Sequence, residues 1–516
     1  MALEELPENF GHLQRLTKVD LSNCARLRKL PESFSNLSNL ETLDLTNCTS
    51  FQELPPSICE LEKLKVLRLH GMGLDELPEN FGHLQRLTEV DLSNCGRLSK
   101  LPESFSNLSN LETLYLTNCT SFQELPPSIC ELEKLKVLRL GGTALEELPE
   151  NFGHLQRLTE VSLSNCGRLS KLPESFSNLS SLEKLDVLEC SVLQKLRASI
   201  GGLKKLGVLR ITSTLLDELP VDLCKLQSLE KADMSWCTSL RTLPDSFFQL
   251  GHLVELNMFE CELLEGLPPS FCKLKNLKFL RVTSAGLKEL PEDFGQLQSL
   301  KEVNLSHCLK LTELPDSFSN LSKLEDVNLF GCKLLQKFPT SVCQLTNMRV
   351  LQMRGTALEE LPEDFGQLKS LTYADLSQCV SLTKLPDSFS ELSNLEYLNL
   401  SGCSLLRQLP PFIGRVKRLR VLRMGRTALE ELPEDFGQLE CLTDADFQRC
   451  KQLRSLGESF GCLVKLRKLS LRGCSSLIQL PESFLKLSDL SSLDVRSCPL
   501  LQMGALPMNQ LRLRLT

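Results

Sequence analysis

The chain has 516 residues, with 58 Lys and Arg against 65 Asp and Glu, and only 5% aromatic side chains. The net charge of -7 argues against a nucleic-acid partner, because a protein that binds phosphates along a nucleic acid needs a basic field. No apolar run approaches the ~18 residues of a membrane-spanning helix. The opening MALEELPENF lacks the basic and apolar segments of a signal peptide. We therefore expect no membrane span.

The sequence repeats itself with a period of 71 residues. Residues 6–76 and 77–147 differ at only eight of 71 positions, and later blocks keep the same frame. Each block contains units of 24, 24 and 23 residues, which we index by a central apolar residue, from Val19 to Leu493. This gives 21 units, and a shortened unit around Leu513 makes 22. Because no linker or change in composition interrupts the series, we expect a single domain over residues 1–516.

Each unit follows the pattern L-x-x-L-x-L-x-x-C-x-x-L-x-x-L-P-x-x-F-x-x-L. The alternation in L-x-L predicts a short strand with one buried face. The Pro, which has no N–H to donate, ends the strand ladder, and F-x-x-L fits a single turn of helix or 3-10 helix. One unit cannot bury its own leucines, so stacked neighbours must do so. We predict an α/β solenoid, a horseshoe or gently curved arc, with a parallel sheet on its concave face and short helical, 3-10 or loop segments on its convex face.

Cysteine is concentrated in one column of this repeat. Of the 22 Cys, 15 lie three residues beyond the last apolar position of the predicted strand, as Cys24 and Cys48 do. Neighbouring members lie within disulfide range for Cα atoms, but their side chains point the same way into the core. A zinc site would need four converging ligands, and no C-x-x-C occurs. We therefore expect no metal site, and buried thiols that bond backbone carbonyls in a reducing, cytoplasmic compartment.

The sequence offers no catalytic constellation. The motifs G-x-x-x-x-G-K-[ST], H-E-x-x-H and G-x-S-x-G are all missing. Three of the six His are one position copied three times (His12, His83 and His154), and the acidic residues that follow the Pro also form a repeated row. Catalysis needs one asymmetric cluster, which repeated positions cannot easily supply. We expect no enzyme activity, no catalytic residues and no cofactor.

Side chains between the leucines of each strand should face the concave surface. In the third unit of the first six blocks this position is Arg in all but one case, whereas the other units usually carry an acidic or polar residue there. Two interpretations remain open: charge pairing between strands of the sheet, or contact with a partner. The arginines are Arg68, Arg139, Arg210, Arg281 and Arg423.

Aromatic residues add a second set of candidates, since Tyr, Trp and Arg are the usual anchors of protein interfaces. All three Tyr and the single Trp fall on strands or strand exits that we expect to be exposed, and Phe259 joins them. The C-terminal third is also locally basic, which fits either a solvated face or the docking of an acidic surface or a phosphate. The aromatic candidates for a protein-binding concave face are Tyr115, Trp236, Phe259, Tyr373 and Tyr397. The basic residues are Arg354, Arg415, Lys417, Arg418, Arg420, Arg423, Arg426, Arg449, Arg472 and Arg496.

The unit is similar to the leucine-rich repeat, and its L-P form resembles the repeats of plant intracellular nucleotide-binding leucine-rich-repeat immune receptors. The segment LNLSGCSLLRQLPPFIGRVKRLRVL (398–422) is similar to the form found beside toll/interleukin-receptor-type domains. The resemblance covers essentially the whole chain. It implies innate immune signal transduction, in which a repeat region senses a pathogen effector, a host guardee or a signalling protein and restrains a nucleotide switch.

The chain departs from that family in having no P-loop, nucleotide-binding module or signalling domain. It also begins in mid-unit without an N-terminal cap, since Met1 aligns with Thr143 of a later copy. We therefore expect a repeat region from a longer disease-resistance receptor that supplies those domains, or a truncated relative. The alternatives are a free-standing intracellular signalling scaffold of the Ras-group type, or a recently expanded array with no selected ligand.

Overall fold

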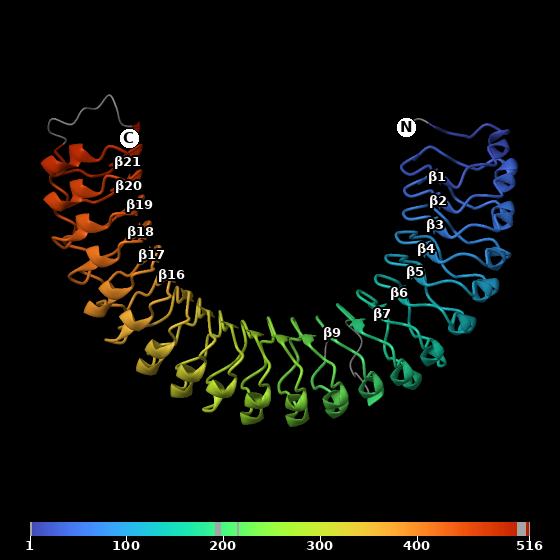
Figure 1. Cartoon of the computed structure of the whole chain (residues 1–516), viewed down its shortest axis with the longest axis horizontal. Coiled ribbons are helices and arrows are strands. Elements are labelled where there is room, and N and C mark those ends of the chain that lie inside the picture. Colours follow the sequence, from blue (N-terminus) through green and yellow to red (C-terminus); the bar gives the residue numbers. More distant parts are fainter. Residues whose placement is uncertain (1–2, 191–197, 214–215, 503–511, 515–516) are drawn as a thin grey trace. The chain divides into compact units, whose positions relative to one another are not determined.

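The structure, a computed structural model, describes residues 3–190, 198–213, 216–502 and 512–514. The chain divides into two compact units, unit 1 (Met1–Met258) and unit 2 (Phe259–Thr516). In both units each repeat contributes one three-residue strand and one short 3-10 helix, and the strands line one face while the helices line the other (Figure 1). The prediction of a leucine-rich-repeat solenoid is confirmed. The prediction of one domain over residues 1–516 stays a prediction.

The strands of unit 1 are β1 (Lys18–Asp20), β2 (Thr42–Asp44), β3 (Val66–Arg68), β4 (Glu89–Asp91), β5 (Thr113–Tyr115), β6 (Val137–Arg139), β7 (Glu160–Ser162), β8 (Lys184–Asp186), β9 (Val208–Arg210), β10 (Lys231–Asp233) and β11 (Glu255–Asn257). Those of unit 2 are β12 (Phe279–Arg281), β13 (Glu302–Asn304), β14 (Asp326–Asn328), β15 (Val350–Gln352), β16 (Tyr373–Asp375), β17 (Tyr397–Asn399), β18 (Val421–Arg423), β19 (Asp444–Asp446), β20 (Lys468–Ser470), β21 (Ser492–Asp494) and β22 (Arg512–Arg514). The middle residue of every strand is the apolar residue by which the sequence indexed its repeat.

The 3-10 helices of unit 1 are η1 (Phe10–His12), η2 (Glu32–Asn36), η3 (Pro56–Glu60), η4 (Phe81–His83), η5 (Glu103–Asn107), η6 (Pro127–Glu131), η7 (Phe152–His154), η8 (Glu174–Asn178), η9 (Ala198–Gly202), η10 (Val221–Lys225) and η11 (Asp245–Gln249). Those of unit 2 are η12 (Pro269–Lys273), η13 (Phe294–Gln296), η14 (Asp316–Asn320), η15 (Thr340–Gln344), η16 (Phe365–Gln367), η17 (Asp387–Glu391), η18 (Ile413–Arg415), η19 (Phe436–Gln438), η20 (Glu458–Cys462) and η21 (Glu482–Lys486).

Within each unit, consecutive strands pair in parallel and in the register of the repeat. In unit 1, Val19 lies opposite Leu43 and Leu43 opposite Leu67, and in unit 2 Ala374 lies opposite Leu398. In β1 to β21 the middle residue of each strand points into the core and is buried, whereas the residues on either side lie on the open strand face. This alternation is the period of two expected for a strand with one buried face.

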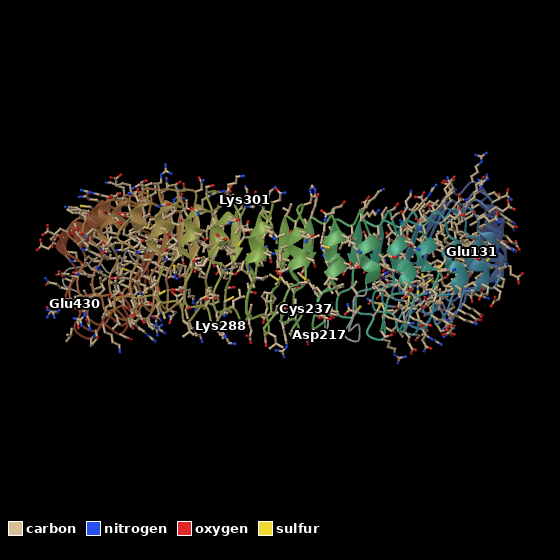
Figure 2. The ribbon with its side chains drawn as sticks, turned by 90° about the horizontal axis from the view of Figure 1, so that it is seen from below. Glu131, Asp217, Cys237, Lys288, Lys301 and Glu430 are labelled. Atoms are coloured by element: carbon tan, nitrogen blue, oxygen red, sulfur yellow. The ribbon has the colours of Figure 1, made fainter. Side chains whose placement is uncertain are left out.

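A left-handed turn follows each strand from β1 to β21. The residue four places after the centre of each of these strands has a positive φ, and it is Asn five times in unit 1, for example Asn23 (60°) and Asn47 (58°). Asn suits this position because it tolerates the left-handed conformation better than most residues. We call the row formed by these turns and the residues just after them the turn edge. Figure 2 shows Lys288 and Glu430 on this edge of unit 2 and Lys301 on the opposite edge.

Phenylalanine rings stack on one another in the core beneath many of the 3-10 helices. The rings of Phe81 and Phe105 stack with centroids 5.5 Å apart, and those of Phe365 and Phe389 stack at 5.7 Å. All four rings are fully buried. Burial of each ring should stabilise the fold by about 2–3 kcal/mol.

The cysteine column is a row of free, mostly buried thiols. Most thiols of this column donate to a backbone carbonyl of the preceding repeat, as Cys48 Sγ does to the Leu21 carbonyl at 3.3 Å and Cys332 Sγ to the Leu305 carbonyl at 3.1 Å. The acceptor carbonyl belongs to the residue that follows the strand, where the turn needs a partner. The predicted role of these thiols, in which they fill the turn and bond backbone carbonyls, matches this geometry.

Glycine is required where a 3-10 helix touches the next repeat. A Cβ at Gly82 would lie 1.9 Å from the Ser104 carbonyl oxygen, while the Gly82 N–H donates to Ser104 Oγ at 3.1 Å. Gly11, Gly153 and Gly295 face a serine of the next repeat in the same way, so a side chain at any of them would collide with the neighbouring helix.

Candidate functional site

The open strand face of unit 1 carries arginines that are neutralised by carboxylates on adjacent strands. Arg68 on β3 contacts Glu89 of β4, with 2.9 Å between Nη2 and Oε1, and lies 3.9 Å from the Asp44 carboxylate. The Glu89 carboxylate raises the pKa of Arg68, first through their hydrogen bond and then through its charge. Arg210 on β9 lies 3.7 Å from Asp186. Of the two interpretations that the sequence left open for these arginines, the contacts fit charge pairing between strands of the sheet.

Arg139 combines an ion pair with an aromatic contact. Its Nη2 lies 3.0 Å from Glu160 Oε1, and its guanidinium lies 5.1 Å from the ring centre of Tyr115. Tyr115 is half-buried rather than exposed as the sequence suggested, because Arg139 and the neighbouring strands cover its ring. The structure thus brings these two predicted site residues into contact, with the Arg139 guanidinium packed over the Tyr115 ring.

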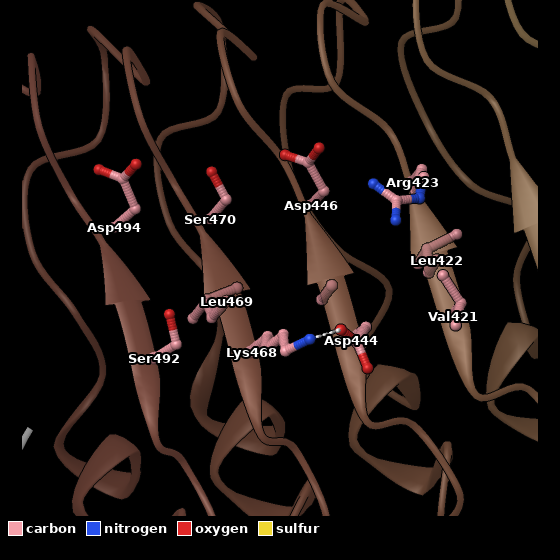
Figure 3. Close-up of a pocket in the computed structure, with 11 residues that line it drawn as sticks. Val421, Leu422, Arg423, Asp444, Asp446, Lys468, Leu469, Ser470, Ser492 and Asp494 are labelled. Carbon is pink, nitrogen blue, oxygen red and sulfur yellow. Dashed lines mark ion pairs between the residues drawn. The ribbon is translucent and has the colours of Figure 1, made fainter. Parts of the chain in front are cut away.

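The strand face of unit 2 differs because its arginines lack such partners. Arg281 on β12 and Arg423 on β18 are exposed, and neither forms an ion pair within the described part of the chain. Arg281 lines a hollow of about 190 Å³ over β12–β15, and Arg423 lines one of about 350 Å³ over β18–β21. Figure 3 shows the second hollow, in which Arg423 and Asp446 stand near the strand ends while Lys468 pairs with Asp444 at 3.7 Å.

Between these hollows lies an apolar strip, which we define as Val350, Tyr373, Tyr397 and Val421, the first residues of β15–β18. The rings of Tyr373 and Tyr397 stack with centroids 4.5 Å apart and planes within 2°. Burial, and then the charge of Asp375, raise the pKa of Tyr373 to about 12. Both tyrosines are half-buried, so each keeps one face or edge available to solvent.

The last positions of β13, β14 and β17 carry oriented amides that the sequence argument overlooked. Asn304 Oδ1 accepts the Ser306 N–H at 3.0 Å, and Asn328 Oδ1 and Asn399 Oδ1 accept equivalent N–H groups at 2.9 and 3.0 Å. Because the oxygen is engaged, the Nδ2 group of each amide is held in place with no acceptor among the described residues. The signal was present, since these Asn occupy the same L-x-L position as the arginines.

Two of the predicted aromatic residues lie beside the strands rather than on them. Trp236 occupies the left-handed turn after β10 with φ of 63° and is 50% exposed, and Phe259 is half-buried just after β11. Both therefore lie on the turn edge, because the strand ends at the preceding Asp233 or Asn257.

The basic segment 415–426 is neutralised only in part. Arg415 lies over the ring of Phe412, 4.5 Å from its centre, and Arg418 donates to Asn394 Oδ1 at 2.8 Å. Lys417 pairs with Glu440, and Arg420 lies 3.6 Å from Glu396. Arg423 and Arg426 have no such partner in the described residues.

The basic residues outside this segment also differ in their contacts. Arg354 lies over the ring of Phe330, and Arg496 pairs with Asp494. Arg449 and Arg472 form no ion pair within the described residues.

The described residues show no assembled chemistry for a metal ion. No group of three or more His, Cys, Asp and Glu side chains among them could hold one. Burial raises the pKa of Cys48 and Cys95 to about 11 and that of Cys119 to about 12, so these thiols stay protonated at neutral pH. Within the described ranges, no helix is both long and apolar enough to cross a membrane.

These features define a leucine-rich-repeat solenoid, a fold whose inner sheet commonly serves as a binding surface. Family profiles agree with this description. The profile described as a leucine-rich repeat region matches residues 5–95 and 115–214, that of the Zer-1-like leucine-rich repeats matches 79–147, and the single Leucine Rich Repeat matches 252–274, 299–321 and 394–416.

Curated relatives include proteins of Arabidopsis thaliana named for disease resistance. The chain is 30% identical over 271 residues to the protein SUPPRESSOR OF npr1-1, CONSTITUTIVE 1, which covers 52% of this chain and 18% of that protein. A probable disease resistance protein is 28% identical over 198 residues, covering 38% of this chain and 11% of the relative. The chain thus spans less than a fifth of the length of either relative.

Solved structures with the same fold include receptors. A plant peptide hormone receptor in complex with RGF2 has a TM-score of 0.54 and 21% identity, with 94% of this chain and 93% of that chain covered. The TDR receptor has a TM-score of 0.58 and 22% identity, with 95% and 82% covered. At this identity the likeness concerns the fold alone.

Proposed function

We propose that the chain is a protein-binding module and that its partner docks on the open strand face of unit 2. The observation that carries the proposal is the apolar strip with its stacked tyrosines beside the unpaired Arg423. Aromatic rings and arginine are the groups that most often anchor protein interfaces. The oriented amides of Asn304, Asn328 and Asn399 would add hydrogen-bond donors for backbone or side-chain oxygens of the partner.

The strand face of unit 1 suits a secondary role in this proposal. Arg68, Arg139 and Arg210 already contact carboxylates of the chain itself. A partner would have to break these pairs before it could use the arginines. We therefore place the anchors of the interface among the residues of unit 2, at Arg281, Tyr373, Tyr397 and Arg423.

At a finer level, we propose that the module is the sensing and regulatory repeat region of a plant disease-resistance receptor of the toll/interleukin-receptor-type subgroup. Support comes from relatives named for disease resistance, whose aligned parts are 18% and 11% of their length. Nucleotide-binding and signalling domains would then lie elsewhere in the parent protein. The free thiols of the cysteine column support the proposal that the protein works in a reducing compartment, the cytoplasm.

Site-specific photo-crosslinking in plant cells tests where the partner docks. A photoreactive phenylalanine analogue at Tyr397 should yield discrete protein adducts. The same analogue at Lys323, an exposed position between η14 and β14, should yield none of them. Identical adducts from both positions would refute docking on the strand face.

A charge reversal provides the second arm of this test. Arg423→Glu should weaken capture of the cross-linked partner at least tenfold, whereas Lys323→Glu makes the same charge change in the same unit and should leave capture unchanged. Both side chains are exposed, so neither change should disturb the core. Equal capture by the two variants would contradict the role of Arg423.

A further inference from the structure

The turn edge of unit 2 contains a hollow with an unusual lining. The hollow has a volume of about 410 Å³ and is lined by the cations Arg426, Arg449 and Lys451, with Ser404 and Gln452 among its neutral residues. No carboxylate lines it, in contrast to the hollow at Arg423 on the strand face, whose lining includes three aspartates. Every charged residue that lines this hollow is therefore a cation.

Its three cations are not used by the chain itself. Within the described ranges, Arg426, Arg449 and Lys451 form no ion pair, although acidic residues are available nearby. Glu430, two residues beyond the hollow's Ala428, instead faces Arg407 at 3.7 Å. The three side chains are exposed, so their charged ends are accessible from solvent.

The backbone places two of these cations at equivalent positions of consecutive turns. Arg426 and Arg449 occupy the left-handed position of their turns, with φ of 63° and 59°. Unit 1 repeatedly places Asn at this position, as at Asn23, Asn47 and Asn94. Arginine gains nothing from this conformation and here has no intramolecular ion pair to compensate for it. This left-handed position recurs after each strand from β1 to β21, and here it holds arginines on two neighbouring turns.

We propose that this hollow binds a phosphate-bearing anion. Two guanidinium groups present planar forks that match phosphate oxygens, and Lys451 adds a point charge. The Ser404 hydroxyl and the Gln452 amide supply neutral donors for the remaining oxygens. The site lies on the turn edge and uses none of the residues assigned to partner binding, so it is independent of the proposed function.

Isothermal titration calorimetry of the full chain at fixed ionic strength tests the proposal. The probes are pyrophosphate, sulfate, a neutral peptide with two phosphoserines, and the same peptide with two glutamates. Pyrophosphate or the phosphopeptide should bind at least tenfold more tightly than sulfate and the glutamate peptide. The tighter of the two phosphate probes identifies the source as a free small phosphate or a phosphorylated protein, and both results support the site.

Matched variants distinguish phosphate binding in the hollow from a general effect of the net charge of the chain. The double variant R426N/R449N should weaken phosphate binding at least tenfold and should unfold at the same or a higher temperature, because Asn suits both turns. The control K323N/K465N removes two exposed positive charges elsewhere in unit 2 and should change binding less than twofold. The proposal is overturned if no phosphate probe binds, if sulfate or the glutamate peptide binds equally well, or if both variants behave alike.

Discussion

Units 1 and 2 have the same kind of core, but their surfaces differ. In both, buried leucines, stacked phenylalanines and hydrogen-bonded thiols recur with the period of the repeat. On the strand face, Arg68 of unit 1 is held by Glu89, whereas Arg423 of unit 2 has no ion pair in the described residues. Copying of the repeats thus preserves the core residues that hold them together. Divergence of the surface residues creates charged groups that form no ion pair within the chain.

The same contrast holds along the turn edge. In unit 1 an arginine just after the turn pairs with a carboxylate, as Arg97 does with Asp75 at 2.6 Å, whereas Arg426 and Arg449 of unit 2 form no ion pair among the described residues. Unit 2 also exposes aliphatic side chains there, such as Leu334 and Leu405, which are 50% and 53% exposed. An unpaired cation or an exposed leucine adds nothing to the stability of the solenoid. The surface that diverged from the copied pattern is therefore the surface on which we place both proposed sites.

The largest expected effect comes from a charge in the shared core. Leu67→Asp in unit 1 and Leu351→Asp in unit 2 should each destabilise the fold by about 4 kcal/mol, because both positions are fully buried and an aspartate there would have no partner. Stability in a solenoid is a sum of local terms, so each change should open its own unit first. Hydrogen exchange followed by mass spectrometry measures this, and equal loss of protection in both units would contradict local coupling.

The phenylalanine stack should respond alike in the two units. Phe105→Ala and Phe389→Ala should each cost about 3–5 kcal/mol, because both rings are fully buried and stacked on a neighbour. Phe10 is only half-buried, so Phe10→Ala serves as the smaller control. Chemical denaturation gives the free energies, and a difference above about 2 kcal/mol between the two buried sites would show that the cores are not equivalent.

Alkaline pH should weaken both units through the cysteine column. Burial raises the pKa of Cys48 to about 11 and of Cys332 to about 12, against about 8.5 for an unfolded thiol. Above pH 8.5 the unfolded chain loses protons that the folded chain keeps, so stability is full below that pH and falls as pH rises toward the folded pKa. Each thiol should lower the stability by up to about 1.4 kcal/mol per pH unit, and by about half of that at pH 8.5, where the unfolded thiol is half ionised.

Denaturant unfolding between pH 8.5 and 9.5 measures this slope. Replacing one thiol of each unit, as in the double variant C48A/C332A, should make the loss of stability with pH shallower than in the unchanged chain. An unchanged slope would mean that other groups control the alkaline response.

The smallest expected effect concerns the aromatic pairs that distinguish the two strand faces. A double-mutant cycle on Tyr373 and Tyr397 with Ala should give a coupling of about 0.5–1.5 kcal/mol, as for other aromatic pairs. A cycle on Tyr115 and Arg139 should give about 0.5–1 kcal/mol, because that cation–π contact is more exposed. Unfolding free energies of single and double variants supply both values, and a coupling near zero for the tyrosines would remove the pre-formed anchor from unit 2.

The fold could be predicted because one signal was repeated. The L-x-L pattern placed every strand centre correctly, from Val19 to Leu513, since a strand with one buried face has no other register that buries its leucines. The 3-10 helices followed from the Pro and Phe spacing. The sequence also placed Arg423 and the three Tyr on strands, where the structure has them.

What could not be predicted depends on side-chain reach and backbone angles. A long guanidinium can choose among several carboxylates, so the sequence could not tell that Arg68 would contact Glu89 more closely than Asp44. The left-handed turn was missed although the repeated Asn signals it, and with it the unusual position of Arg426. The stacking of the tyrosines was also missed, even though their spacing of one repeat makes them neighbours on adjacent strands.

The parallel register has a consequence for how the gene can change length. Val66 of β3 lies opposite Glu89 of β4, and 71 residues later Val137 of β6 lies opposite Glu160 of β7. Recombination that removes residues 77–147 would seat β7 beside β3 with the partners that β4 has now. Gain or loss of a whole block therefore preserves the strand pairing at the junction. What changes is the number of strands, and with it the length of the strand face on which a partner could bind.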